Sequence, residues 1–418
     1  MKIIYLHQYF NTPEMSGGTR SYEMSKRMVA AGHEVHMVTS YREEQKEHKG
    51  WFTTDEAGIK VHWYPVPYSN QMSYVQRISA FFTFAFAAKK KAASLQGDVV
   101  FATSTPLTIA IPAVLTARKL KVPMVFEVRD LWPDMPIAMG ALKNPALQFF
   151  AKKLERWAYN NSAAVVALSP GMKEGVLKTG YPANQVAVIP NSSDNLEFTH
   201  DAEAAMKFRA DRAWLGDKPL LLYAGTFGKV NGVNYIVKVA KELKKLNSNI
   251  RILLVGDGGE KVQVIAEAKD TGVFEENVFF EPAMFKKDMP ILFNAATMTS
   301  NLVTDLPEAR ANSANKFFDS LAASKPILLN HGGWMHDIVK THDCGLAMWQ
   351  QPIELVAEQL HEKMNNDEWL KRAAIAAKKL AVQEFDRDLL ANQLITILRL
   401  AIEKRSTEVA KVAPGVYS

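Results

Sequence analysis

The sequence of 418 residues is too long for one ordinary domain and suits two domains of about 200 residues each. Hydrophobic residues make up 48% and charged residues 22%, which excludes a disordered chain. The single cysteine, Cys344, excludes an internal disulfide and a cysteine-based zinc site, and it fits a reducing compartment. The net charge of +6 is modest for a nucleic-acid-binding protein but suits an anionic ligand or an anionic membrane surface.

The first half of the chain alternates short apolar runs with amphipathic stretches. The apolar runs predict buried parallel strands at residues 2–8, 34–40, 59–64, 98–102, 123–128, 164–169 and 186–190. Helices are expected up to residue 31 and at residues 74–95, 107–120 and 145–160. The uncharged residues 99–117 contain prolines, so we expect no membrane-spanning helix there, and the N-terminus does not resemble a signal peptide.

The second half repeats this alternation. Strands are expected at residues 220–224, 250–255, 277–281, 296–303 and 326–330, with helices between them and almost only helices after Pro352. This pattern predicts the α/β class, with two Rossmann-like parallel-sheet domains. The domains would comprise residues 1–195 and 196–385, and a C-terminal helix at about 386–405 would complete the first domain.

A glycine-containing segment, Ser16-Gly17-Gly18-Thr19-Arg20, follows the first expected strand and opens the first helix. A strand, a glycine turn and a helix form the geometry of a nucleotide-facing loop, because glycine lets the backbone approach a ligand closely. The third glycine of the dinucleotide fingerprint is missing, which disfavours a nicotinamide dehydrogenase.

Arg129 and Asp130 follow the expected strand at residues 123–128. Charged residues at the carboxyl end of a parallel strand point into the ligand crevice of a doubly wound sheet. An ion pair at the edge of the domain is the alternative. His7, which ends the first strand, reads as a core histidine, and the later histidines lack metal-ligand spacing, so no metal site is expected.

Residues 225–229, Gly-Thr-Phe-Gly-Lys, join an expected strand to an expected helix. The segment is not a P-loop, because Val230 stands where a P-loop has its magnesium-binding Ser or Thr. It is either a phosphate-binding loop or a tight turn with an incidental Lys229. Residues 256–259, Gly-Asp-Gly-Gly, read as a strand-to-helix turn.

Residues 312–330 predict a helix, a tight turn and a buried strand. Lys316 and Asp319 share one face near the start of this helix, while Phe317 and Phe318 lie on the other side. A helix N-terminus offers partial positive charge and N–H groups to a phosphate. The lysine adds a full charge, and the carboxylate can accept hydrogen bonds from a sugar diol, so the segment suits a nucleotide-diphosphate sugar. A surface helix with an unrelated Lys/Asp pair is the alternative.

The expected helix at residues 74–95 is rich in phenylalanine and has a basic end. Its phenylalanines are too crowded to face one direction, which is typical of an interfacial amphipathic helix. The helix at residues 145–160 repeats the mixture of aromatic and basic residues. We predict that both helices dock on a membrane; the alternative is that the phenylalanines belong to the core.

Together, four segments resemble glycosyltransferase family 4, which has the GT-B architecture of two Rossmann-like domains facing a central cleft. They are residues 16–20, 128–133, 224–229 and 315–326, in the expected order along nearly the whole chain. The chain is most similar to the bacterial branch that makes O-antigen, capsule and other surface polysaccharides, the fucosamine-transferase-like group.

The resemblance implies a retaining transfer, without obligatory metal or other cofactor, from a nucleotide diphosphate sugar. The expected donor is a UDP-sugar, such as an N-acetylated amino sugar. The expected acceptor is a saccharide linked to undecaprenyl diphosphate at the cytoplasmic face of the inner membrane, where the protein would be peripheral. Fixed positive charges would stabilise the leaving diphosphate, and a phosphate oxygen would take the acceptor proton. No nucleic acid is expected as a partner.

The resemblance also implies site residues. The catalytic residues would be Lys229, Lys316, Arg129 and Asp130. The donor nucleotide and diphosphate would contact Gly17, Gly18, Gly225, Thr226, Gly228, Lys229, Ala283, Met284, Phe285, Asn315, Lys316 and Asp319. The acceptor or the membrane would contact Arg20, Trp132, Phe81, Phe82, Lys89, Lys90 and Lys91.

The chain departs from the family at one motif. The Glu-x7-Glu motif would end at Asp319 and begin at Ala311, so its first carboxylate is absent; Glu308 is the nearest acid. The arginine partner of the loop lysine is also not evident. Two other functions therefore stay open: an inverting GT-B transferase with a base such as His7 or Asp130, and an inactive scaffold subunit that binds nucleotide sugars.

Overall fold

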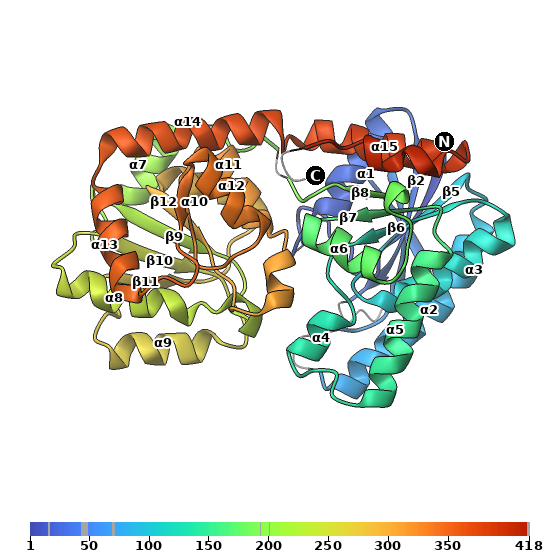
Figure 1. The fold of residues 1–418 in the computed structure, drawn as a ribbon, viewed down its shortest axis with the longest axis horizontal. Helices are drawn as coiled ribbons and strands as arrows, with labels where there is room; N and C mark the ends of the chain where they lie inside the picture. Colours follow the sequence, from blue (N-terminus) through green and yellow to red (C-terminus); the bar gives the residue numbers. More distant parts are fainter. Residues whose placement is uncertain (16, 43–48, 69–71, 193, 200, 416–418) are drawn as a thin grey trace. The chain divides into compact units, whose positions relative to one another are not determined.

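The computed structural model describes residues 1–15, 17–42, 49–68, 72–192, 194–199 and 201–415. The chain divides into two compact units, Met1–Pro190 with Asp388–Ser418, and Asn191–Arg387. The division lies a few residues before the expected boundary at residue 195, and each unit contains its own sheet (Figure 1).

In the described residues, the sheet of the first unit has the order β3-β4-β2-β1-β5-β6-β7-β8. Its strands are β1 (Lys2–Leu6), β2 (Glu34–Tyr41), β3 (Phe52–Glu56), β4 (Ile59–Pro65), β5 (Val99–Thr103), β6 (Met124–Val128), β7 (Ala164–Ala167) and β8 (Val186–Val188). All neighbours pair in parallel except β3 and β4, which form an antiparallel hairpin. The strand β3 was not predicted.

Several helices of the first unit begin with a side-chain cap. The helices of this unit are α1 (Arg20–Ala30), α2 (Tyr74–Ser94), α3 (Ala110–Leu120), α4 (Asp134–Ala138), α5 (Pro145–Asn160), α6 (Pro170–Lys178) and α15 (Arg387–Ile402). Ser73 and Gln76 form a capping box at the start of α2, and the Asn144 side chain accepts from two backbone N–H groups at the start of α5.

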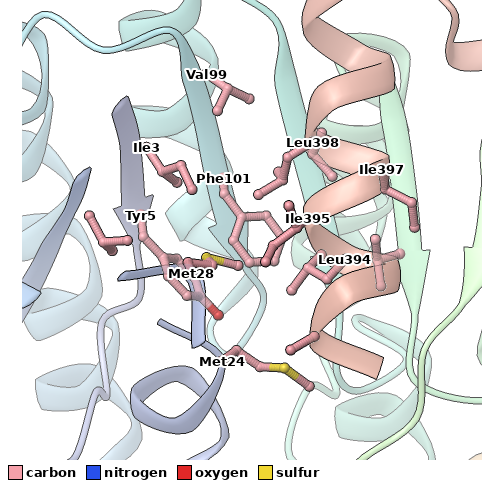
Figure 2. Close-up of a cluster of buried hydrophobic side chains, with 14 of the residues drawn as sticks. Ile3, Tyr5, Met24, Met28, Val99, Phe101, Leu394, Ile395, Ile397 and Leu398 are labelled. Atoms are coloured by element: carbon pink, nitrogen blue, oxygen red, sulfur yellow. The ribbon is translucent and has the colours of Figure 1, made fainter. Parts of the chain in front are cut away.

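The core of the first unit includes the last long helix of the chain. Ile3 and Tyr5 of β1 pack with Phe101 of β5 on the side of the sheet that α15 covers with Leu394 and Leu398 (Figure 2). Burial of this apolar face of α15 ties the C-terminal residues to the first unit.

In the described residues, the sheet of the second unit is fully parallel, with the order β11-β10-β9-β12-β13-β14. Its strands are β9 (Leu220–Ala224), β10 (Arg251–Val255), β11 (Val278–Glu281), β12 (Met298–Asn301), β13 (Ile327–Leu329) and β14 (Gly345–Ala347). Its helices are α7 (Ala202–Ala210), α8 (Asn234–Lys245), α9 (Lys261–Asp270), α10 (Met289–Ala295), α11 (Asn315–Ala322), α12 (Trp334–His342), α13 (Ile353–Met364) and α14 (Asp367–Gln383).

Both sheets are doubly wound, as predicted. The strand order reverses between β1 and β5 in the first unit and between β9 and β12 in the second. Ligands of such sheets bind at the carboxyl ends of the strands beside this reversal. Among the described residues, no helix is long and apolar enough to cross a membrane.

Candidate active site

In the second unit, two glycine-containing loops pair backbone to backbone at the carboxyl ends of β9 and β10. The Gly225 N–H donates to the Val255 carbonyl at 2.9 Å, and the Phe227 N–H donates to the Asp257 carbonyl at 2.9 Å. A Cβ added at Gly256 would lie 1.9 Å from the Gly225 carbonyl oxygen. Glycine at residue 256 is therefore required for this close approach of the two loops at the edge of the sheet.

Lys229 lies where the loops after β9 and β12 meet, beside the reversal of strand order. It begins a single 3-10 turn, Lys229–Asn231, and its side chain is exposed. The Thr304 hydroxyl donates to the Lys229 carbonyl at 2.5 Å, and the Thr304 N–H donates to the Val230 carbonyl at 2.7 Å. In the described part of the chain the Lys229 ammonium has no carboxylate partner, so its charge is available to an anionic ligand.

Helix α11 has the two faces that the sequence predicts. Phe317 and Phe318 are buried, and Phe318 and Phe385 lie with ring centroids 5.2 Å apart. On the other face Asn315, Lys316 and Asp319 are partly exposed. The helix begins without a side-chain cap, so its first backbone N–H groups are not satisfied by capping. The helix thus presents a lysine, a carboxylate and an uncapped N-terminus together.

The Lys316 ammonium is buried against the glycine loop, and no described residue provides a counterion. It donates to the Tyr223 hydroxyl at 3.3 Å and lies 4.4 Å from the centre of the Tyr223 ring. The Tyr223 hydroxyl in turn donates to the Thr226 carbonyl at 2.7 Å. Burial lowers the Lys316 pKa to about 8, and among the described residues no carboxylate offsets this effect. An anion that binds beside a buried cation of this kind stabilises its charge strongly.

Sequence reasoning missed another lysine at this edge. The Lys261 ammonium donates to the carbonyls of Gly256 at 2.7 Å and Glu281 at 3.3 Å, so it links the ends of β10 and β11. The turn at residues 256–259 was correctly predicted. The signal that could have revealed this lysine is its place at the first position of the following helix.

The segment expected to border the base follows β11. Ala283, Met284 and Phe285 connect β11 to a short 3-10 helix, Lys286–Asp288. The Phe285 side chain is 60% exposed, and the Lys287 ammonium lies 5.9 Å from the centre of its ring. An exposed aromatic ring at this place is available for stacking.

In the first unit, Arg129 and Asp130 do not pair with each other. One Arg129 N–H donates to His7 Nε2 at 3.4 Å, and the Asp130 carboxylate accepts from the Thr105 hydroxyl at 3.1 Å. These contacts lie at the carboxyl ends of β1, β5 and β6, and they contradict the alternative of a local ion pair. Burial and then the charge of Arg129 hold the His7 pKa well below its usual value, so the imidazole is neutral.

His7 is buried, as predicted for a core histidine, but its ring is not fully satisfied. His7 is 4% exposed, and its Nδ1 has no hydrogen-bond partner in the described residues. Trp132 is half-buried, and its backbone N–H donates to the Asp130 carbonyl at 3.0 Å. Polar groups of β1, β5 and β6 therefore gather at this edge.

The prediction that Arg20 contacts the acceptor or the membrane is wrong. Arg20 is 2% exposed and donates to the Glu127 carboxylate at 2.9 Å and to the Pro190 carbonyl at 2.6 Å. Glu127 is itself fully buried and also accepts from the Thr103 hydroxyl at 2.7 Å. A buried carboxylate needs such a partner, so Arg20 holds α1 on the sheet.

The glycine loop of the first unit is exposed at Gly17 and Gly18, whereas Ser16 lies outside the described residues. Gly17 has φ of +125°, and a Cβ there would lie 2.6 Å from Asn11 Nδ2. The Asn11 amide donates to the Gly18 carbonyl at 3.2 Å. Glycine at position 17 therefore fits both the backbone conformation and the contact with Asn11.

The phenylalanines of α2 face several directions, as predicted. Phe84 is buried, Phe82 and Phe86 are exposed, and Phe86 is 68% exposed. Phe81 is half-buried against aromatic rings of its own unit, and Lys91 lies 5.9 Å from the centre of the Trp51 ring. Of the residues expected at the membrane, Phe82, Lys89 and Lys90 are exposed, and Phe81 and Lys91 turn back to the protein.

Two family models match most of the chain. The model for the glycosyl transferase 4-like domain matches residues 17–192, and the model for glycosyl transferases group 1 matches residues 206–380. A curated relative, the putative colanic acid biosynthesis glycosyl transferase WcaI of Escherichia coli K12, is 25% identical over 301 residues, which cover 67% of this chain and 72% of the relative.

Solved structures share the fold. Sucrose-phosphate synthase from Thermosynechococcus elongatus matches with a TM-score of 0.77 and 15% identity, covering 96% of this chain and 99% of the synthase. Anabaena HepE in complex with UDP-glucose matches with a TM-score of 0.69 and 15% identity, and the match covers 96% of this chain and 99% of HepE. The predicted GT-B fold is thereby confirmed.

Proposed function

The chain belongs to the GT-B glycosyltransferases that have an N-terminal glycosyl transferase 4-like domain and a C-terminal glycosyl transferases group 1 domain, and from this membership we propose its donor and acceptor. It moves a sugar from a nucleotide diphosphate sugar, a UDP-sugar, to a lipid-linked saccharide during synthesis of a bacterial surface polysaccharide. The name of the relative WcaI, which refers to colanic acid biosynthesis, supports this setting, and the UDP-glucose bound to HepE supports the donor class.

The proposal is supported chiefly by the Lys316 ammonium, which is buried beside the glycine loop and has no carboxylate partner among the described residues. The diphosphate of the donor lies on this loop and pairs with Lys316 and Lys229, and the uncapped start of α11 adds N–H donors. Asp319 accepts hydrogen bonds from the ribose hydroxyls, and the base lies beside Ala283, Met284 and the exposed ring of Phe285. Asn315 and Thr226 border the phosphates.

The reaction proceeds with retention of the anomeric configuration. As the bond between the sugar and the diphosphate breaks, negative charge grows on the leaving phosphate, and the fixed lysines stabilise it. The acceptor hydroxyl attacks from the face that the diphosphate leaves, and a phosphate oxygen takes its proton. These cations also supply the charge that a divalent metal supplies elsewhere, so transfer is expected to continue in excess EDTA.

Calorimetry with UDP, GDP and ADP tests the donor site. We expect UDP to bind the full-length protein, and Lys316→Ala to weaken binding about 10- to 100-fold, because a charged hydrogen bond contributes about 1.5–3 kcal/mol. Lys241→Ala, which removes an exposed lysine of α8, is the charge-matched control and should bind normally. Equal UDP affinity in wild type and Lys316→Ala would refute the assignment.

The acceptor is presented by a membrane, and α2 and α5 of the first unit dock there. Phe82 and Phe86 of α2 and Phe149 and Phe150 of α5 are exposed, and Lys89, Lys90, Lys152 and Lys153 are exposed on the same helices. Both helices pack against α3. Exposed aromatic rings with lysines suit the interface of an anionic bilayer.

Sedimentation with vesicles tests the docking. Vesicles rich in phosphatidylglycerol should retain the wild type and lose most of a variant with Ser at residues 82, 86, 149 and 150. Vesicles of phosphatidylcholine alone should retain little of either protein. Binding of the variant at the wild-type level would contradict the docking proposal and would leave the donor-site proposal unaffected.

A further inference from the structure

Three aromatic side chains of the first unit form a cluster at the carboxyl edge of its sheet. Tyr9 follows β1, Tyr68 follows β4, and Phe81 comes from α2. The ring centroids lie 4.7 Å apart for Tyr9 and Tyr68, 6.4 Å for Tyr9 and Phe81, and 6.2 Å for Tyr68 and Phe81. All three rings are partly exposed, and none belongs to the buried core around Tyr5 and Phe101, so the cluster lies at the surface of the unit.

A cation and an amide connect this cluster to the glycine loop. Arg42, which follows β2, lies with its guanidinium 5.9 Å from the centre of the Tyr9 ring and donates to the Asn11 side-chain oxygen. Asn11 also donates to the Gly18 carbonyl and lies where a side chain at Gly17 would clash. The aromatic rings, the guanidinium and the glycine backbone therefore form one continuous wall.

Beside the rings the fold leaves a polar group unsatisfied. Gln8 is 1% exposed, and its amide nitrogen donates to the Ala80 carbonyl, next to Phe81, at 3.5 Å. Its Oε1 has no hydrogen-bond partner in the described residues. An unsatisfied buried carbonyl is unfavourable for stability, and a departure of this kind is typical of a functional site.

We propose that Tyr9, Tyr68, Phe81 and Arg42 form the acceptor subsite, and that this subsite binds the sugar–phosphate unit of the acceptor. The apolar face of the sugar ring stacks on Tyr9 and Tyr68, and the Arg42 guanidinium pairs with the phosphate. This inference rests on the proposed function, because it assumes that the acceptor is a phosphate-linked saccharide.

Calorimetry of the full-length protein with two probes tests the subsite: decyl diphosphate, and decyl diphosphate that carries one N-acetylglucosamine. Tyr68→Ala should weaken binding of the sugar-bearing probe about tenfold and leave the sugar-free probe unchanged, because stacking involves only the sugar. Tyr68→Phe keeps the ring and should bind both probes normally. Arg42→Gln should weaken both probes by similar factors, since both carry the diphosphate.

The controls separate this inference from the function on which it rests. UDP affinity should be the same in wild type and Tyr68→Ala, because the diphosphate of UDP is assigned to Lys229 and Lys316 of the second unit. Failure of the wild type to bind any nucleotide would overturn the function itself. If UDP binds but Tyr68→Ala leaves both probes unaffected, the subsite is wrong. If Tyr68→Ala loses the same factor of affinity for both probes, the rings bind the lipid chain, and the assignment to the saccharide is overturned.

Discussion

Binding of the donor diphosphate should take up a proton at alkaline pH, and Lys316 is the group that takes it. Burial holds the Lys316 pKa at about 8, below the ordinary value of 10.5. A bound diphosphate beside the ammonium should restore the pKa at least to that ordinary value. At pH 9 about a tenth of the free protein carries the proton, whereas nearly all of the complex does. Uptake should therefore be about 0.9 proton at pH 9 and about 0.1 at pH 7.

The affinity for UDP should fall accordingly. Between pH 7 and pH 9 the dissociation constant should rise about tenfold, because the free lysine must first be protonated. Calorimetry at each pH in two buffers with different ionisation enthalpies measures the proton number directly. Lys316→Arg is the matched control, since arginine stays charged throughout and should bind without proton uptake. A wild type that binds UDP at pH 9 with uptake below about 0.2 proton would refute this role of Lys316.

Three further predictions concern stability, measured by urea unfolding. Lys316→Met should raise the free energy of unfolding of the ligand-free protein by about 1–2 kcal/mol at pH 7, because the lowered pKa means that folding disfavours the charged lysine. This gain in stability should shrink as the pH rises from 8 towards 10.5, where the lysine loses its charge in both states. A gain that stays constant over this range would show that the buried charge is not its cause. Gly256→Ala should destabilise the second unit by about 1–3 kcal/mol and weaken UDP binding, because its Cβ would lie 1.9 Å from the Gly225 carbonyl; Gly259→Ala, which meets nothing within 4 Å, should do neither. Arg20→Met should destabilise the first unit by about 3–5 kcal/mol by leaving Glu127 buried without its partner, and a loss below about 1 kcal/mol would show that the pair is dispensable.

The parts of the site that depend on local sequence could be predicted. The two faces of α11 follow from helical spacing, so Lys316 and Asp319 were correctly placed opposite the buried Phe317 and Phe318. The glycine loop at residues 225–229 was found for the same reason, because a strand, a turn and a helix follow one another in the chain. Local patterns of this kind also predicted the doubly wound sheets.

Features that depend on distant partners could not be predicted. The role of Arg20 is set by Glu127, which lies 107 positions away, and no local pattern reports this pairing. Phe81 differs from Phe82 only in which side of α2 it occupies, and the crowded phenylalanines do not reveal which side meets Tyr9. The hairpin strand β3 was missed because its turn, Ala57-Gly58, lacks the Asn-Gly or Asp-Gly signal, although both residues have positive φ.

Transfer of a sugar from a nucleotide sugar to a lipid-linked acceptor should require Lys316. Incubation of the protein with radiolabelled UDP-sugars and lipid extract from a polysaccharide-producing bacterium measures this directly, as label that enters the organic phase. We expect transfer from at least one UDP-sugar by the wild type and by Lys241→Ala, and a loss of at least about 100-fold in Lys316→Ala, because the lysine both binds the diphosphate and stabilises the charge that grows on it as the bond breaks. Transfer at the wild-type rate by Lys316→Ala would show that Lys316 takes no part in the reaction.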